Sequence, residues 1–142
     1  MIETLSTLVG KEINNPRVVI EQGFRGISTD TANCLMRVNT AYSVCDGTIL
    51  SVDKSPKTDE WCVTVEVGPS RWVRYCGLSS TGLLAGKEIH KRDFVGYGNN
   101  GYIRFEYCTA NKNKFPVRIL GIQLYKQDPT PIIFTKKDIT EM

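Results

Sequence analysis

WCVTVEVGPSRWVRYCGL, residues 61–78, is the stretch that decides the fold. From Trp61 to Val67 an apolar side chain stands at every second position, which is the period of a half-buried β-strand. The next four residues, Gly-Pro-Ser-Arg, carry the glycine and proline that mark a turn. An apolar run follows and predicts a returning strand. The stretch is therefore expected to form an antiparallel β-hairpin.

Short strand patterns of the same kind extend on both sides of this hairpin. AYSVCDGTILSVDK (41–54) has two apolar runs separated by Asp-Gly, a pair that forms either a hairpin turn or a sharp corner. FVGYG (94–98) and YIRFEYC (102–108) are separated by a Gly/Asn turn, and FPVRILGIQLY (115–125) is expected to be extended. Turn signals recur roughly every ten residues without a long helical pattern, which predicts an all-β fold.

Length and composition limit the class of protein. The chain has 142 residues, which suits one domain, with 41% hydrophobic and 23% charged residues, as in a folded globular protein. The net charge of +3 is too small to indicate nucleic-acid binding by itself. No apolar run is long enough to span a membrane, and the first residues lack the apolar centre of a signal peptide. We therefore expect a protein made in the cytoplasm, without a membrane or nucleic-acid partner.

The ends of the chain differ from its middle. We expect an N-terminal segment at 1–22, a β domain at 23–134 and a charged C-terminal tail at 135–142. IETLSTLV (2–9) fits a short helix or an extended arm, and RVVI (17–20) fits a short strand.

The chain has five cysteines and no Cys-x-x-Cys motif, and with no export signal reduced thiols are the default expectation. Most of them are expected to be small core residues. The five are Cys34, Cys45, Cys62, Cys76 and Cys108.

Five blocks of the chain resemble a known family in their order and spacing. They are AYSVCDGTILSV, WVRYCGLSS, GLLAGKEIHKRDFVGYGNNG, YIRFEY and YKQDPTPIIF. In this order they are similar to the blocks of the lysostaphin/LytM-type zinc endopeptidases of bacterial cell walls. The resemblance implies an antiparallel β-sandwich or barrel of the duplicated hybrid motif type, with short N- and C-terminal extensions.

The resemblance also implies where the family's zinc site would be. The ligand positions of the opening loop match Phe24 and Ser28, and the two histidines of a His-x-His strand match Tyr102 and Arg104. A further histidine, in a Tyr-x-His-Leu-Ser block, matches Gly77. A guanidinium has no lone pair to give to a metal. The five positions are therefore expected to form a vestigial groove without zinc.

The histidine count supports the same conclusion. The family's site uses four histidines, whereas this chain has one, His90, in a loop that the resemblance places away from the site. A slipped alignment could restore one carboxylate, from Asp30. A zinc site of the family's kind still needs more histidines than the chain contains. We therefore expect no catalytic residue, metal or cofactor.

An inactive relative on this scaffold is expected to be a structural or binding module. The favoured setting is a phage tail or tail-like injection machine, near its baseplate, hub or tip, as part of the virion. Its partners would be other tail proteins or further copies of itself, with peptidoglycan as a further candidate. The alternative is a non-catalytic cell-wall factor that binds murein or regulates a wall hydrolase.

Other readings of single residues stay open at this point. Cys62 and Cys76 lie on the two strands of the hairpin, but simple alternation gives them mismatched parity for a shared metal site. A cysteine nucleophile would lack a nearby base. Trp61 and Trp72 are expected to face each other across the hairpin, in core packing or as a stacking surface. Lysine patches with Trp72, Tyr75 and Tyr97 are a weak nucleic-acid signal.

Overall fold

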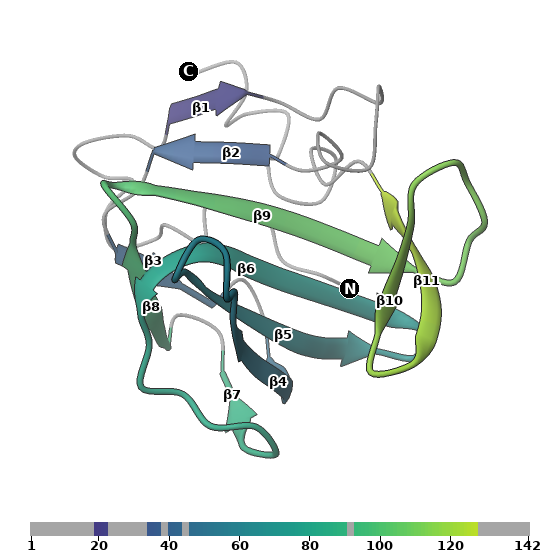
Figure 1. Cartoon of the computed structure of the whole chain (residues 1–142). Helices are drawn as coiled ribbons and strands as arrows, with labels where there is room; N and C mark the ends of the chain where they lie inside the picture. The colour runs from purple at the N-terminus through teal and green to yellow at the C-terminus, as the bar shows by residue number, and fades with distance from the viewer. Residues whose placement is uncertain (1–18, 23–33, 38–39, 44–45, 91–92, 128–142) are drawn as a thin grey trace, which may run out of the picture.

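The structure is a computed structural model, and it describes residues 19–22, 34–37, 40–43, 46–90 and 93–127. These residues form strands, turns and loops, and they contain no helix that could span a membrane (Figure 1). The strands are β1 (Val19–Gln22), β2 (Cys34–Arg37), β3 (Thr40–Tyr42), β4 (Gly47–Lys54), β5 (Trp61–Gly68), β6 (Arg71–Ser80), β7 (Glu88–Ile89), β8 (Phe94–Gly98), β9 (Tyr102–Thr109), β10 (Pro116–Ile119) and β11 (Ile122–Gln127).

All strand pairings in the described residues are antiparallel, so the expected all-β antiparallel fold is confirmed. The main path of the sheet runs β1-β2-β9-β6-β5-β4-β7. The β10–β11 hairpin joins it through β9, and the β3–β8 pair joins it through β6. Within the described part, β1 and β7 do not pair with each other, so the sheet is not closed into a barrel.

The predicted hairpin is present as β5 and β6, and it contains two bulges. Val67 is an extra residue on β5 near the turn, and Gly77 is an extra residue on β6 near its far end. Gly77 has a φ of +81°, a left-handed conformation that favours glycine. Between the bulges the register is displaced by one residue, which brings Cys62 opposite Cys76. The parity mismatch expected for these cysteines is therefore wrong.

The pair Asp46-Gly47 marks a corner rather than a hairpin, because β3 pairs with β8 and β4 pairs with β5 and β7. A Cβ on Gly47 would come within 2.5 Å of the carbonyl oxygen of Glu66, so the corner requires glycine. The stretch 115–125 differs from the single extended segment expected. It turns back on itself at Leu120 and Gly121, whose positive φ angles of 50° and 80° are those of a two-residue hairpin turn.

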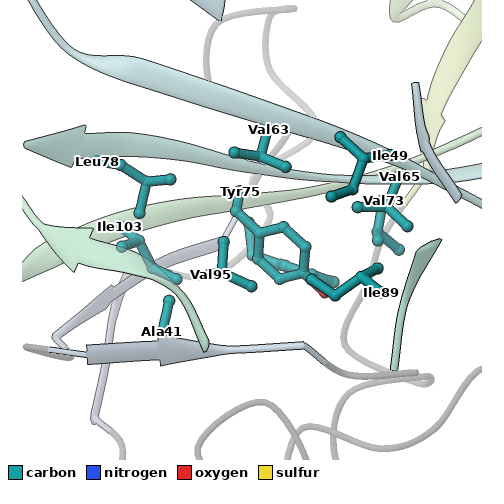
Figure 2. Packing of buried hydrophobic residues seen from close by; sticks show 11 residues of the cluster. Ala41, Ile49, Val63, Val65, Val73, Tyr75, Leu78, Ile89, Val95 and Ile103 are labelled. Carbon is teal, nitrogen blue, oxygen red and sulfur yellow. The ribbon is translucent and has the colours of Figure 1, made fainter. Parts of the chain in front are cut away.

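The main core lies on one face of the sheet, here called the inner face. Strands β3, β7 and β8 lie across this face, so that Ala41, Ile89 and Val95 meet Tyr75 and its neighbours (Figure 2). The fully buried members are Ala41, Ile49, Val63, Val65, Val73, Tyr75, Leu78, Ile89, Val95, Ile103 and Phe105. Tyr75 is 0% exposed, so it cannot be a stacking platform for bases.

A second, smaller cluster lies on the opposite, outer face of the sheet, against the β10–β11 hairpin. It contains Trp72, Cys108, Ile119 and Leu124. Trp61, in contrast, packs against the main core. The two tryptophans thus belong to different clusters, and Trp61 pairs with Leu78 and Trp72 with Glu66. The expectation that they face each other across the hairpin is wrong, and both pack against apolar side chains.

Candidate functional site

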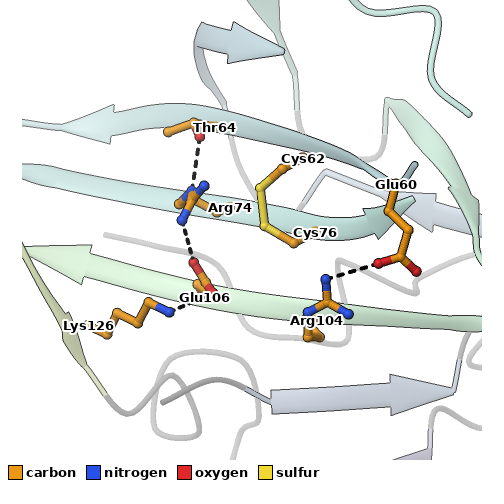
Figure 3. Close-up of a disulfide and its surroundings, with 8 residues drawn as sticks. All are labelled: Glu60, Cys62, Thr64, Arg74, Cys76, Arg104, Glu106 and Lys126. Carbon is orange, nitrogen blue, oxygen red and sulfur yellow. Dashed lines mark hydrogen bonds and ion pairs between the residues drawn. A yellow bond between two sulfur atoms is a disulfide. The ribbon is translucent and has the colours of Figure 1, made fainter. Parts of the chain in front are cut away.

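The part of the outer face that the smaller cluster leaves uncovered is polar. Val63, Tyr75 and Phe105 point into the core, so their chain neighbours point outward by strand alternation. Charged, hydroxyl and sulfur groups from three adjacent strands therefore lie side by side (Figure 3). They are Cys62 and Thr64 on β5, Arg74 and Cys76 on β6, and Arg104 and Glu106 on β9.

All of these side chains except that of Thr64 border a depression of about 250 Å³, here called the outer groove. Its lining comes from the turn after β4 and from β5, β6 and β9. The lining residues are Ser55, Thr58, Glu60, Trp61, Cys62, Arg74, Cys76, Gly77, Arg104 and Glu106.

Two of the five residues predicted for the vestigial groove meet here. A Cβ on Gly77 would lie 3.5 Å from Nη1 of Arg104, so the guanidinium covers the glycine of the bulge. Tyr102 is half-buried on the same strand as Arg104, two residues earlier and hence on the same face, but it does not line the groove. Phe24 and Ser28 lie outside the described residues, as does Asp30.

Arg104 forms an ion pair with an acidic residue from a distant part of the chain. Its Nη2 donates to Oε1 of Glu60 at 3.2 Å, and the Asn99 side-chain amide donates to Oε2 of Glu60 at 2.7 Å. The Asn99 backbone N–H also donates to the carbonyl of Gly77 at 2.9 Å. Burial raises the pKa of Glu60, but the hydrogen bonds from Asn99 and Arg104 and the charge of Arg104 outweigh it, so the pKa lies below 4.5.

A second charged cluster lies at the other end of the groove. Glu106 is 7% exposed and accepts from Nη1 of Arg74 at 2.8 Å and from Nζ of Lys126 at 3.0 Å. Nε of Arg74 donates to Oγ1 of Thr64 at 3.2 Å. One carboxylate thus lies between two cations, and the cluster ties β5, β6, β9 and β11 together.

Cys62 and Cys76 are joined in a disulfide between the two clusters (Figure 3). The expectation of reduced thiols is therefore wrong for this pair, because the register shift at Val67 places the two cysteines opposite each other. Cys108 is a free thiol buried in the smaller cluster, in line with the expected core role. Burial and the neighbouring charge of Glu106 raise its pKa to about 12. Nothing is described of the Cys34 and Cys45 side chains.

The donor groups in the groove do not fit a zinc ion. The described residues contain no group of three or more His, Cys, Asp or Glu side chains that could hold a metal. At the family's positions, Gly77 has no side chain and Arg104 is a cation without a lone pair. The sulfurs are bonded to each other, and Glu60 and Glu106 already bind cations. His90 is exposed, with Nδ1 3.6 Å from Oδ1 of Asp46, and does not line the groove.

The sequence reasoning missed the partners of the groove's cations. Arg74 and Glu106 alternate correctly with the core positions of their strands, so their outward direction was available from the pattern. The sequence pattern does not show that β6 and β9 are neighbours in the sheet, because β7 and β8 lie between them in the chain. Glu60 and Asn99 are 39 residues apart, Glu60 lies outside the matched blocks, and no sequence signal joins the two residues.

No protein-family model and no curated protein sequence matches the chain. Solved structures do match. A chain of the SpoIIQ–SpoIIIAH pore-forming complex matches with a TM-score of 0.63 at 14% identity, covering 99% of this chain and 96% of that one. The antimicrobial peptidase lysostaphin from Staphylococcus simulans gives a TM-score of 0.60 at 14% identity, over 80% of this chain and 48% of lysostaphin. A zinc-containing peptidase from Vibrio cholerae gives 0.52 at 18% identity, over 63% and 32%.

These matches show the fold, which is that of the lysostaphin/LytM-type peptidases. The resemblance inferred from the five sequence blocks is thereby confirmed. The described residues hold no metal-binding group, which is consistent with a degenerate version of that domain. It spans less than half of lysostaphin and about a third of the Vibrio cholerae peptidase, but nearly all of the matched SpoIIQ–SpoIIIAH chain.

Proposed function

We propose that the chain is a peptidase-like module that binds another protein and does not cleave peptides. One observation carries the proposal: Arg104, paired with Glu60, covers Gly77 at the positions where the family would place histidines. The groove is therefore lined at this point by a cation that Glu60 of the same chain neutralises. Its chemistry is that of a recognition surface, with N–H donors of a guanidinium that is 40% exposed.

The same arrangement opposes zinc chemistry in the groove. A catalytic zinc needs three protein ligands and an open position for water. Here the nearest groups are a guanidinium, a disulfide and carboxylates that already hold cations. A divalent cation placed beside Arg104 would be repelled by its positive charge. The described residues therefore do not supply the zinc ligands that hydrolysis by the family's route requires.

A protein is the partner that the comparisons favour. The match covering nearly the whole of both chains is to a chain of a complex between two proteins. The outer groove is lined by charged and polar groups that a protein partner could pair with, and the disulfide and both ion-pair clusters hold its floor in place. Such preorganisation lowers the cost of ordering on binding.

The setting of the assembly stays a prediction. A disulfide persists outside reducing compartments, which suits a virion surface and also a cell-wall location. We propose the phage tail or tail-like machine, with other tail proteins or further copies as partners. Peptide mass spectrometry of purified particles tests this setting. Absence from particles, together with retention on purified murein, would favour the cell-wall factor instead.

The proposed function is tested in two assays. Release of fragments from purified peptidoglycan, with zinc added and lysostaphin as the positive control, should not exceed the buffer blank. Chelator-sensitive release would overturn the non-catalytic assignment. For binding, a photo-crosslinking residue at Thr58, on the exposed rim of the groove, should give one protein adduct in the native cells. The same residue at Lys87, which is exposed outside the groove, should not; equal labelling at both sites would count against docking in the groove.

A further inference from the structure

The disulfide between Cys62 and Cys76 lies in the wall of the outer groove and outside the two apolar clusters. Both cysteines line the outer groove, Cys62 is half-buried, and Cys76 is 7% exposed. They lie opposite each other on β5 and β6, two strands that the sheet already holds side by side. The bond is therefore not needed to bring these strands together, and a reagent in the groove can approach it.

The two sulfurs have different charged neighbours. Cys76 lies opposite Arg104 on β9, and Arg74 is two residues earlier on its own strand and face. Cys62 lies opposite Asp53 on β4, and Glu60 is two residues earlier.

Other charges reduce this difference without removing it. Glu60 pairs with Arg104, and Glu106 pairs with Arg74. Lys126 adds a second cation on Glu106. Directly across the strands, however, Arg104 is the residue opposite Cys76, and Asp53 is the residue opposite Cys62. A negative charge on sulfur is therefore better stabilised at Cys76 than at Cys62.

We propose that this disulfide is a thiol-exchange site, at which a thiolate attacks Sγ of Cys62 and Cys76 is the leaving group. The incoming sulfur forms a new S–S bond with Cys62 while the Cys62–Cys76 bond breaks. Its electron pair leaves on Sγ of Cys76 as a thiolate beside Arg104. One disulfide replaces another, so no external oxidant or reductant is consumed. The incoming group is a thiol, either a small molecule or a cysteine of a partner protein.

Cys108 provides an internal contrast. It is 0% exposed, and burial together with Glu106 raises its pKa to about 12, so it carries almost no thiolate at neutral pH. Exchange is therefore confined to the groove among the cysteines whose side chains are described. Thiol exchange needs no protein partner in the groove, so its test is independent of the test of the proposed docking.

The test treats the folded, full-length chain with 2-mercaptoethanol, an uncharged thiol, and quenches with acid after short times. Free thiols are then blocked with N-ethylmaleimide, and peptides are mapped by mass spectrometry. We expect the mercaptoethanol adduct on Cys62, the maleimide on Cys76, and Cys108 unlabelled. An adduct mainly on Cys76, or a disulfide that resists thiol levels that reduce oxidised glutathione, would overturn the proposal. Glutathione and a short cysteine-containing peptide, used in parallel, show which source of thiol the groove accepts.

A matched pair of variants tests the role of the cations. An opposite charge nearby lowers a pKa by about one unit or more, and one unit on a thiol changes exchange rates roughly threefold. Arg104→Gln should therefore slow exchange about threefold, and Arg104→Lys should retain most of the rate. Lys87→Gln removes an exposed cation that does not line the groove and should leave the rate unchanged. Equal rates in Arg104→Gln and Lys87→Gln, with native circular dichroism in both, would overturn the assignment of Cys76 as the leaving group.

Discussion

The cluster of Arg74, Glu106 and Lys126 predicts that Glu106→Gln destabilises the domain strongly. Each oxygen of Glu106 binds one cation, at 2.8 Å and 3.0 Å, and the carboxylate is 7% exposed. Glutamine has nearly the same shape but no charge, and its NH₂ group presents hydrogens where one cation now donates. The substitution therefore leaves two cations close together without the carboxylate that separates them.

The expected magnitude follows from how far water reaches the cations. Removing one partner of a buried ion pair costs roughly 3–5 kcal/mol, because the other charge stays buried without compensation. Lys126 is 9% exposed, but Arg74 is 21% exposed and keeps its bond to Thr64. We therefore expect a loss at the lower end, about 3 kcal/mol of the free energy of unfolding.

Urea unfolding followed by tryptophan fluorescence measures this loss, with the slope of the transition checked for equal exposed surface. Asp59→Asn is the matched control, because it makes the same carboxylate-to-amide change in an exposed ion pair. Asp59 lies 2.9 Å from Nζ of Lys54, with side chains 86% and 46% exposed. Its φ of 63° also suits asparagine. The control should lose less than about 1 kcal/mol. Equal losses in the two variants would refute the reasoning.

Two further predictions concern the other end of the groove and the β10–β11 turn. Burial raises the pKa of Glu60, but its bonds to Asn99 and Arg104 lower the pKa below 4.5 overall. The contribution of ionised Glu60 to the free energy of unfolding is therefore complete at neutral pH, and it is lost as the pH falls through the lowered pKa. The unfolding free energies of wild type and Glu60→Gln should therefore differ at neutral pH and converge as the pH falls below the lowered pKa. A difference that persists in acid would contradict this. Leu120 is 64% exposed with a φ of 50°, a conformation that asparagine adopts more readily, so Leu120→Asn should raise the free energy of unfolding by about 1 kcal/mol. A loss of stability by the same urea assay would show that the Leu120 side chain contributes more than its backbone conformation costs.

Much of the fold follows from apolar alternation and turn residues. The points at which the sequence-based prediction is wrong have local structural causes. The strands of the central hairpin are where the pattern of 61–78 puts them. The bulge at Val67 leaves no mark in that pattern, because Val67 still packs against the core beside Val63 and Val65. The sequence therefore gives the wrong parity for Cys62 and Cys76. The sequence pattern does not predict the β10–β11 hairpin, because Leu-Gly is not one of the common hairpin-turn pairs.

Only the part of the site that lies within the spaced sequence blocks could be predicted from the sequence. The blocks around Gly77 and Arg104 match positions of one site in the family, and in the structure a Cβ added to Gly77 would lie 3.5 Å from the Arg104 guanidinium. Their partners depend on which strands are neighbours in space. The ion pair between Arg74 and Glu106 requires that β6 and β9 adjoin, and Glu60 reaches Arg104 across 44 residues of chain. Neither follows from local pattern.

Zinc binding in solution tests the central claim most directly. In isothermal titration calorimetry the metal-free, disulfide-bonded chain is titrated with zinc, and the lysostaphin catalytic domain serves as the positive control. Because Arg104, paired with Glu60, stands at one of the family's ligand positions, we predict no stoichiometric binding to the chain. One tightly bound zinc per folded chain, lost in a variant of a groove residue, would contradict the account.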